Sequence, residues 1–373
     1  MKKIYSSMIL SLITILMLGF LSSTVSAFSG SGAGTSGNPY QITNCDQLQE
    51  MNNNLAANYI LINDIDCSAT SGWNSGAGFL PISTFTGTFD GQNHIISKLF
   101  INRPSLDQVG LFGISSGIIE NVGLVNVDIL GSTSQYSDTG GLVSYNFGTI
   151  TNSYSTGSVS GSGDVGGLVS YNSGIITNSY STGSVSGSAG SHAGGLVGLN
   201  SGAIENSYST GDVTSSGYAT GGLVGYESHG TVTNSYATGS VSGASFVGGL
   251  IGSNSGTITS SYATGSVSGT GGSIGGLIGW NYGTVTSSYW DIQTSGQSTS
   301  ADGIGKTTAE MKTQSTFVGW DFNNIWSINS HENNGYPYLL PEQIPPMVPE
   351  FGLIAGITTV LGALGMFFFV RKK

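Results

Sequence analysis

Charged residues are scarce in this sequence of 373 residues, of which they make up 8%, whereas soluble domains average about 25%. No Lys or Arg lies between Arg103 and Lys306, although half of the 20 Asp and Glu residues fall in that span. With a formal net charge of −11, such a surface repels phosphate backbones, so we expect no nucleic acid as a partner. Disorder is not expected either, because the chain contains 17 Tyr, 15 Phe and 5 Trp and disordered chains are poor in aromatics.

Cysteine is almost absent, with Cys45 and Cys67 the only two. In an oxidising compartment such a pair is expected to form one disulfide, and closing a loop of this size contributes about 3 kcal/mol. The alternative is two reduced thiols. Because no His or second Cys stands at ligand spacing, we expect no catalytic Cys, no metal site and no cofactor.

Proline is infrequent as well, with 8 residues, whereas Gly is abundant at 60. Gly does not recur at every third position, which excludes a collagen-like chain. The repeated part of the chain has no helical period of sufficient length, which excludes a helical array. Gly, Ser and Thr must therefore serve as regular building material of another repeated architecture.

The N-terminus has the three parts of a secretory signal peptide. Lys2 and Lys3 are followed by an apolar run over 8–21 and by the small-x-small sequence Val25-Ser26-Ala27. We expect cleavage after Ala27, because the apolar run is short for a membrane span. An uncleaved anchor is the alternative.

The C-terminus is predicted to attach the protein to a membrane. Residues 351–370 form an uncharged apolar run of the length that spans a bilayer, and the basic residues 371–373 after it are expected to stay cytoplasmic. A Pro-rich linker precedes the run. We therefore expect the protein on the extracellular face of the membrane, anchored at its C-terminus.

A more specific interpretation of this end uses Pro349-Glu350-Phe351-Gly352. This motif, followed by an apolar helix and a basic tip, resembles the PEF-type C-terminal sorting signals of some archaea and bacteria. The resemblance implies an exosortase- or archaeosortase-like enzyme as a partner that cuts near the motif. Retention of the helix and its removal both remain open.

A repeat of 26 to 28 residues dominates the middle of the chain. The string Gly-Gly-Leu-Val/Ile begins at Gly140, Gly166, Gly194, Gly221, Gly248 and Gly275. Each copy continues with Gly-x-Ile/Val, Asn-Ser-Tyr or a variant of it, and Thr-Gly-x-Val, which gives three β-type pieces separated by turn residues. Because one unit cannot bury its own apolar residues, the units must stack. The sequence predicts an all-β, right-handed parallel β-helix (β-solenoid) with three short strands per ~27-residue coil and small caps at both ends.

The coil corners are expected to hold Gly and Asn, because both tolerate a positive φ. Asn side chains can also bond to their copies one rung away. Two ladders are predicted, one of Asn121, Asn152, Asn178, Asn206 and Asn234, and another of Asn146, Asn172, Asn200, Asn254 and Asn281 that is interrupted at Glu227.

The repeat resembles the GLUG motif, which is named for Gly-Leu-small-Gly. Residues 195–198 and 222–225 fit it, while the copies at Gly141 and Gly167 end in Ser. The resemblance extends over about residues 38–340, and its flanks, 85–91 and 289–292, also fit. It implies a prokaryotic surface protein, since the family includes haemagglutinin-like adhesins and some IgA-protease-type metallopeptidases.

The chain is divided accordingly. The predicted segments are a signal peptide at 1–27, an N-terminal cap and first coils at 28–108, the GLUG-repeat solenoid at 109–289, a C-terminal cap at 290–340, a linker at 341–350, a transmembrane helix at 351–370 and a basic tip at 371–373.

Sites for catalysis are not evident in the sequence. A polysaccharide lyase or hydrolase on a β-helix needs paired carboxylates, and the acids of the array are isolated except for Asp138 and Asp164, which we interpret as solvated loop residues. The sequence His331-Glu332-Asn333-Asn334-Gly335 lacks the second His of a zinc peptidase motif. The other three His residues are scattered and interpreted as surface residues. No catalytic residue is predicted.

A binding role has more support. A candidate aromatic strip recurs once per coil and is predicted to face outward, where it could hold glycan or a partner protein; its members are Tyr154, Tyr180, Tyr208, Tyr236, Tyr262 and Tyr289. A less regular second set comprises Tyr145, Tyr171, Tyr226 and Trp280. The expected function is a non-enzymatic adhesin or envelope structural protein. The alternatives are a polysaccharide-active β-helix enzyme and an inert stalk.

Overall fold

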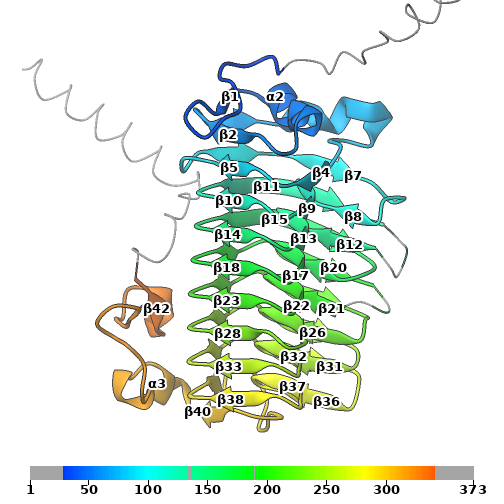
Figure 1. The fold of residues 1–373 in the computed structure, drawn as a ribbon. Coiled ribbons are helices and arrows are strands. Elements are labelled where there is room, and N and C mark those ends of the chain that lie inside the picture. Colours follow the sequence, from blue (N-terminus) through cyan, green and yellow to red (C-terminus); the bar gives the residue numbers. More distant parts are fainter. Residues whose placement is uncertain (1–27, 133, 135–136, 189, 191, 341–373) are drawn as a thin grey trace, which may run out of the picture.

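The computed structural model describes residues 28–340, except 133, 135, 136, 189 and 191. The predicted signal peptide, Pro-rich linker, sorting motif and transmembrane helix therefore lie outside the described residues. Within these residues no helix is long and apolar enough to cross a membrane. Parallel strands stack coil upon coil into a rod, with the N-terminal cap at one end (Figure 1). The prediction of a parallel β-solenoid is confirmed.

Four parallel sheets run along the rod, and we name them A to D in the order in which the chain passes through them. Sheet A contains β1 (Tyr40–Ile42), β2 (Asn58–Leu61), β5 (Thr88–Asp90), β10 (Ile118–Glu120), β14 (Thr149–Thr151), β18 (Ile175–Thr177), β23 (Ala203–Glu205), β28 (Thr231–Thr233), β33 (Thr257–Thr259) and β38 (Thr284–Thr286). Sheet B contains β3 (Ile65–Asp66), β6 (Ile95–Ser97), β7 (Phe100–Asn102), β11 (Gly123–Leu130), β15 (Tyr154–Gly161), β19 (Tyr180–Ser181), β20 (Ser184–Gly187), β24 (Tyr208–Ser209), β25 (Val213–Ser215), β29 (Tyr236–Ala237), β30 (Val241–Gly243), β34 (Tyr262–Ala263), β35 (Val267–Gly269), β39 (Tyr289–Asp291) and β40 (Ile304–Lys306).

Sheets C and D complete each coil. Sheet C contains β8 (Gln108–Val109), β12 (Asp138–Gly140), β16 (Val165–Gly166), β21 (His192–Gly194), β26 (Ala219–Gly221), β31 (Phe246–Gly248) and β36 (Ser273–Gly275). Sheet D contains β4 (Ile82–Phe85), β9 (Phe112–Ser115), β13 (Val143–Asn146), β17 (Val169–Asn172), β22 (Val197–Asn200), β27 (Val224–Glu227), β32 (Ile251–Asn254) and β37 (Ile278–Asn281). The chain thus crosses four sheets per coil rather than the three expected, because in the repeat the strand of sheet C ends at the first Gly of the Gly-Gly pair and the strand of sheet D begins after the Leu that follows the pair.

The glycines of the repeat are needed where sheets C and D pack closely. A Cβ on Gly194, at the end of β21, would lie 1.9 Å from the carbonyl oxygen of Val197. A Cβ on Gly225, in β27, would lie 2.7 Å from the backbone nitrogen of Ala193. Both distances are far below contact, so Gly194 and Gly225 are required by the close approach of two backbones.

The main core lies inside the coil. Residues at equivalent positions in successive coils stack on one another and fill it. The Leu that follows each Gly-Gly pair is fully buried in six consecutive coils: Leu142, Leu168, Leu196, Leu223, Leu250 and Leu277. Ile150, Ile176 and Ile204 on sheet A pack into the same cluster. The stacked coils therefore bury a continuous apolar column that no single repeat could bury alone.

The first predicted Asn ladder occupies the corner between sheets A and B. Its five Asn residues have φ between 49° and 53°, and Ser260 and Ser287 keep the same conformation in the last two coils. Asn234 Nδ2 donates to Asn206 Oδ1 at 3.2 Å, and Asn152 Nδ2 donates to Asn121 Oδ1 at 3.1 Å. The left-handed corner and the bonding along the ladder are both confirmed.

Replacing Asn234 with Ala is expected to lower the free energy of unfolding by about 1–2 kcal/mol, since Ala at positive φ is strained and the ladder bond is lost. Asn234→Gly should cost less, because Gly accepts the left-handed corner. Thermal unfolding of the two variants measures the difference. Equal destabilisation by Ala and Gly would show that the backbone conformation of the corner does not matter.

The second ladder lies buried at the corner that follows sheet D. Asn146 donates to Asn172 at 2.8 Å, Asn172 to Asn200 at 2.7 Å, and Asn254 to Asn281 at 2.6 Å. Where Asn is replaced by Glu227, the carboxylate accepts the amide of Asn200 at 2.8 Å. The interruption predicted at Glu227 is thus a carboxyl rung inside an amide ladder.

The two ends of the rod are covered differently. At the N-terminal end lie α2 (Cys45–Glu50), η1 (Met51–Asn53) and η2 (Ser68–Gly76), and a disulfide joins Cys45 to Cys67. At the other end, β40 pairs with β39, and the hydroxyl of Ser300 accepts from the amides of Leu277 and Ile278. Thr307 and Glu310 form a reciprocal capping box on α3 (Thr308–Met311), as expected from their spacing.

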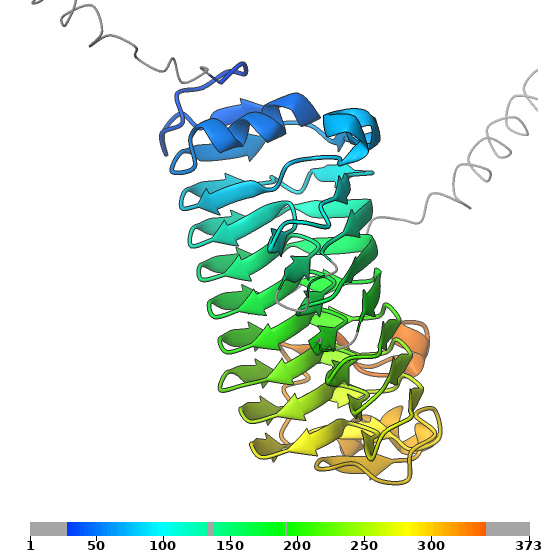
Figure 2. The ribbon, with the colours of Figure 1, turned by 90° about the vertical axis from the view of Figure 1, so that its right-hand side faces the viewer.

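After α3 the chain does not stay at the end of the rod. It passes through η3 (Gln314–Thr316), β41 (Trp326–Ser327), η4 (Asn333–Gly335) and β42 (Tyr338–Leu339), and β41 and β42 form a small antiparallel pair. This part lies beside the last coils rather than below them (Figures 1 and 2). We call residues 308–340 the C-terminal segment.

Candidate functional site

The predicted tyrosine strip lies on the outer side of sheet B. Its six residues are in direct register from β15 to β39. The next residue in each strand points the other way, into the coil, where Ala237 and Ala263 join the main core. The rings therefore belong to a separate cluster outside the main core, which we call the tyrosine ladder.

The tyrosine ladder is buried, which contradicts its interpretation as an exposed contact strip. None of the six side chains is more than 6% exposed. Successive rings from Tyr154 to Tyr262 stack at centroid distances of 4.7 to 5.1 Å with interplanar angles of at most 9°. The spacing of the coils thus brings each ring into contact with its copies, so that the rings cover one another.

The C-terminal segment covers the last three rungs of the ladder. Trp326 lies 6.1 Å from the ring of Tyr236 and 6.0 Å from that of Tyr262, and Tyr289 packs edge-on against Phe317. Tyr262 donates to the carbonyl of Pro337 and accepts from Asn333. Burial raises the pKa of Tyr262 well above its ordinary value. These rings are part of the interior and are not available to a ligand.

The less regular aromatic set identified in the sequence occupies the outer face of sheet D instead. Its positions are in register across eight strands: Thr84, Ile114, Tyr145, Tyr171, Leu199, Tyr226, Ser253 and Trp280. Tyr145 and Tyr171 are in contact at 5.4 Å between centroids, and Phe147, 52% exposed, stacks on Tyr145 at 6.3 Å. Trp280 is 38% exposed. We call these eight positions the aromatic column.

A row of polar side chains on sheet C runs beside the aromatic column. Gln108, Asp138, Asp164 and His192 occupy equivalent positions in four consecutive coils. Asp138 Oδ1 accepts the amide of Asp164 at 2.8 Å, and Asp164 Oδ1 lies 2.7 Å from His192 Nδ1. We call these four residues the polar row.

Asp138 is the most perturbed acid of the polar row. It is 7% exposed, and burial together with the charge of Asp164 raises its pKa to about 6. Tyr145 in the aromatic column hydrogen-bonds to it, which opposes this rise. The interpretation of Asp138 as a solvated loop residue is therefore wrong; the repeat had placed both acids near a corner, but that corner is packed against sheet D.

The two rows remain in contact further along the rod. The ring of His192 lies 5.2 Å from that of Tyr226 and 6.0 Å from that of Tyr218, which is itself 54% exposed. His192 was interpreted as an isolated surface residue, and the structure places it between an acid and two aromatic rings. Asp138, Asp164 and His192 are separated by 26 and 28 residues in the sequence. This spacing, which equals that of the repeat, could have indicated that the three residues lie side by side in successive coils.

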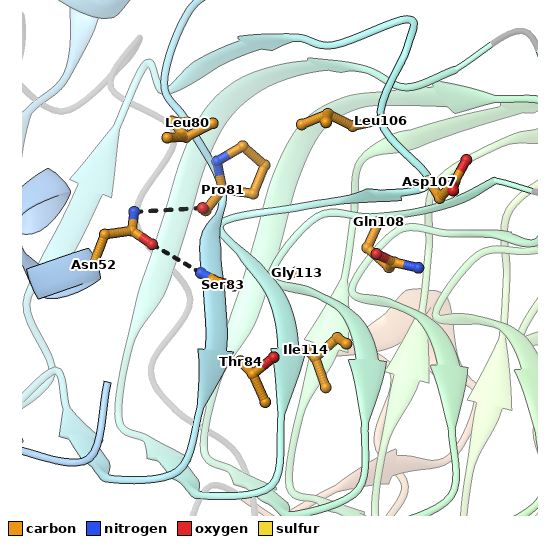
Figure 3. A pocket seen from close by; sticks show the side chains of 10 residues that line it. All are labelled: Asn52, Leu80, Pro81, Ser83, Thr84, Leu106, Asp107, Gln108, Gly113 and Ile114. Atoms are coloured by element: carbon orange, nitrogen blue, oxygen red, sulfur yellow. Dashed lines mark hydrogen bonds between the residues drawn. The ribbon is translucent and has the colours of Figure 1, made fainter. Parts of the chain in front are cut away.

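A shallow pocket of about 290 Å³ lies at the N-terminal end of the same face (Figure 3). It is lined by Asn52, Leu80, Pro81, Ser83, Thr84, Leu106, Asp107, Gln108, Gly113 and Ile114. Asn52 fixes one wall, because its side chain bonds both to the carbonyl of Pro81 and to the amide of Ser83. Leu80 and Leu106 are 45% and 37% exposed. The pocket thus presents an apolar rim and a polar wall.

The arrangement offers hydrogen bonding and apolar contact. Among the described residues, no group of three His, Cys, Asp or Glu side chains is placed to hold a metal ion. The acids of the polar row can accept hydrogen bonds, and the neighbouring rings offer flat apolar surface. This combination is typical of a binding face.

Comparison with known families identifies the repeat. The GLUG motif matches residues 135–160, 161–186, 189–214 and 216–242, which are four consecutive coils of the solenoid. These matches cover the part of the chain that contains Asp138, Asp164 and His192. The resemblance drawn from Gly-Leu-Val-Gly is therefore supported over these coils.

Three known proteins are similar to this chain. Halomucin of Haloquadratum walsbyi is 47% identical over 109 residues, which are 27% of this chain and 1% of halomucin. A protein of Evansella cellulosilytica named as a Gly-rich membrane protein is 35% identical over 135 residues, 34% of this chain and 15% of that protein. A crystal structure of a Bacteroides ovatus protein assigned as an immunoglobulin A1 protease superposes with a TM-score of 0.57 at 25% identity, over 83% of this chain and 94% of that one.

Proposed function

We propose that this chain is a non-enzymatic β-solenoid displayed on the cell surface, where it acts as an adhesin and binds glycan or protein through the aromatic column. The names of two relatives, halomucin and a Gly-rich membrane protein, support a surface or membrane location. Both matches cover a small part of the relative, so they support a surface or membrane location for the solenoid and say nothing about its ligand.

The observation that carries the proposal is the partial exposure of aromatic rings in register along one face. Surface aromatic rings of this kind form contact sites for partners. The tyrosine ladder, although more regular, has no accessible surface to offer. The proposed contact face is therefore on sheet D and not on sheet B, where the sequence had suggested it.

Removing two adjacent rings tests the proposal. Tyr145→Leu combined with Tyr171→Leu is expected to reduce adhesion to cells or to immobilised glycans at least tenfold, because the rings are lost while the apolar character remains. Leu is a tolerated residue in this column, since Leu199 occupies the next rung. Adhesion of the purified chain, measured by surface plasmon resonance or cell binding, provides the readout.

A matched control removes exposed apolar side chains from another face. Ile118→Ser with Ile175→Ser changes residues on sheet A that are 44% and 48% exposed. These changes should leave adhesion intact. If the sheet D variant binds as the unchanged chain does, or if both pairs weaken adhesion equally, the aromatic column is not the contact face.

One observation favours a second candidate, a β-helix enzyme that acts on polysaccharide. Asp138 and Asp164 are adjacent, and a carboxyl group with a pKa raised to about 6 suits a general acid. Turnover of a neutral or acidic polysaccharide that Asp138→Asn abolishes would establish it. Absence of turnover over a broad panel leaves the adhesin as the function.

The attachment of the rod to the cell is part of the proposal. We infer that residues 351–370 hold the chain in the membrane until an exosortase- or archaeosortase-like enzyme cuts near Pro349-Glu350-Phe351-Gly352. These residues lie outside the described part of the chain, and the proposal rests on their sequence alone. The intact mass of the mature protein tests it, because a product that ends near residue 350 requires cleavage and one that ends at Lys373 excludes it.

A further inference from the structure

We infer that the pocket beside Asn52 and the adjoining rungs of the aromatic column and polar row form one groove that binds a neutral oligosaccharide along the rod axis. The terminal sugar unit occupies the pocket, and the following units lie over Tyr145 and Tyr171. This inference rests on the proposed adhesive function and names its ligand class.

The pocket and the rows are continuous. Ile114 and Gln108 both line the pocket; Ile114 is the register neighbour of Tyr145, and Gln108 is the register neighbour of Asp138. The amide of Asp138 donates to the carbonyl of Asp107 at 2.7 Å, which joins the pocket wall to the polar row directly. A ligand that leaves the pocket along the axis therefore meets a tyrosine ring on one side and, on the other, the polar row, in which the side chain of Asp164 is 18% exposed.

The side chains match the chemistry of a sugar ring. A sugar presents apolar C–H faces that pack on aromatic rings, and its hydroxyl groups donate well to carboxylates. Tyr145 and Tyr171 supply the rings, and the exposed Asp107 in the pocket and the partly exposed Asp164 on the adjacent row supply the acceptors.

Charge selects a neutral glycan over an anionic one. No Lys or Arg lies between Arg103 and Lys306, and Asp107 adds a third carboxylate to the groove. Arg103 is nearby in sequence, but its guanidinium donates to the carbonyls of Gly78 and Phe79. Uronic acid or sulfated polymers would therefore meet only negative charge.

The dimensions of the groove suit a short oligosaccharide. The pocket of about 290 Å³ has room for one ring-sized unit, and the rungs follow at about 4.8 Å. The rungs of Thr84, Ile114, Tyr145 and Tyr171 thus offer four successive positions along the axis. An extended chain of a few sugar units can lie over all of them.

The test measures binding of the full-length chain by calorimetry, with a neutral β-linked glucan hexasaccharide and its uronic acid counterpart as probes. The neutral probe is expected to bind at least tenfold more tightly than the acidic one. Leu106→Ser at the pocket rim and Tyr145→Leu on the column should each reduce its affinity about tenfold. Ile118→Ser, on sheet A, should leave the affinity unchanged.

The outcomes separate this inference from the proposed function. If adhesion depends on Tyr145 and Tyr171 but no neutral glycan binds, the partner is a protein, and the groove inference is wrong while the adhesin stands. Equal affinity for the acidic probe overturns the charge argument. If the neutral glycan binds and Leu106→Ser has no effect, the terminal unit does not occupy the pocket.

Discussion

Replacing Trp326 with Ala is expected to release the C-terminal segment from the tyrosine ladder. Trp326 is fully buried and packs against Tyr236, Tyr262 and Trp320, the last at 4.4 Å between centroids. A change from Trp to Ala in a packed core costs about 3–5 kcal/mol. Phe317, Trp320 and Tyr336 belong to the same buried cluster, but Trp326 is the ring that contacts both Tyr236 and Tyr262. Its loss should therefore weaken the attachment of residues 308–340 to the ladder.

The expected result is local opening rather than loss of the solenoid. Hydrogen exchange of residues 308–340 should accelerate strongly, while the coils from β10 to β33 keep their protection, since the main core is a separate cluster. Val318→Ala is the matched control, because Val318 lies in the same segment and is 72% exposed. If exchange accelerates equally in the coils, the segment and the solenoid unfold as one unit and the prediction is wrong.

Such an opening would also expose Tyr236, Tyr262 and Tyr289, which the structure places under the segment. Trp320, Trp326 and Tyr336, which lie within the predicted C-terminal cap at 290–340, pack against this ladder. These aromatic residues cover the side of the rod as well as its end, because the tyrosine ladder offers an apolar surface that must be buried.

The repeat was sufficient to predict the architecture from the sequence. Gly-Gly-Leu-Val every 26 to 28 residues fixed the register of the coils, and the left-handed Asn corner was predictable because few residues tolerate that φ. The division into four sheets was not, since the close approach at Gly194 and Gly225 is a property of two backbones and not of one strand.

The regular spacing of the Tyr residues did not indicate which face of the rod exposes its aromatic rings. Regular Tyr spacing at Tyr180 and Tyr208 reflects the demands of self-stacking, which removes the rings from solvent. The irregular set, with Leu199 and Ser253 between its rings, is the one that remains accessible. A column whose side chains stack on one another needs the same type of residue at every rung. An exposed column tolerates different residues from rung to rung.

The acids were missed for a related reason. Asp138 and Asp164 were assigned to solvent because both precede a Gly-rich corner, and corners are usually exposed. Asp138 is buried and Asp164 is only partly exposed, because Tyr145 and the strands of sheet D lie close in space although several residues further along the chain. Only the three-dimensional contact between sheets C and D brings these groups together.

Glu227 is the second residue whose replacement should have a large effect, and here the change is stabilising. Its side chain is fully buried in the Asn ladder, and Oε1 makes no hydrogen bond within the described part of the chain. Burial raises its pKa from 4.5 to about 8, although the bond from Asn200 opposes the rise. The folded chain therefore holds a proton that the unfolded chain releases in this range.

The sign of the pH dependence follows from this shift. Below pH 4.5 the group is protonated in both states and has no effect on stability. As the pH rises from 4.5 to about 8, the unfolded state ionises freely and the folded state does not, so stability falls and remains lower above pH 8. Each pKa unit corresponds to about 1.4 kcal/mol, so the cost amounts to a few kcal/mol.

Glu227→Gln should remove this loss of stability, because a Gln side chain does not ionise. The amide accepts from Asn200 as the carboxylate does, and it can donate toward Asn254, the register neighbour on the next rung. Thermal unfolding should show a gain that is small at pH 4 and reaches a few kcal/mol at pH 9. Glu205→Gln, at an exposed position on sheet A, is the control and should show little change. A gain that is the same at both pH values would mean that the Glu227 carboxyl group has the same pKa in the folded and the unfolded chain, and the prediction would be wrong.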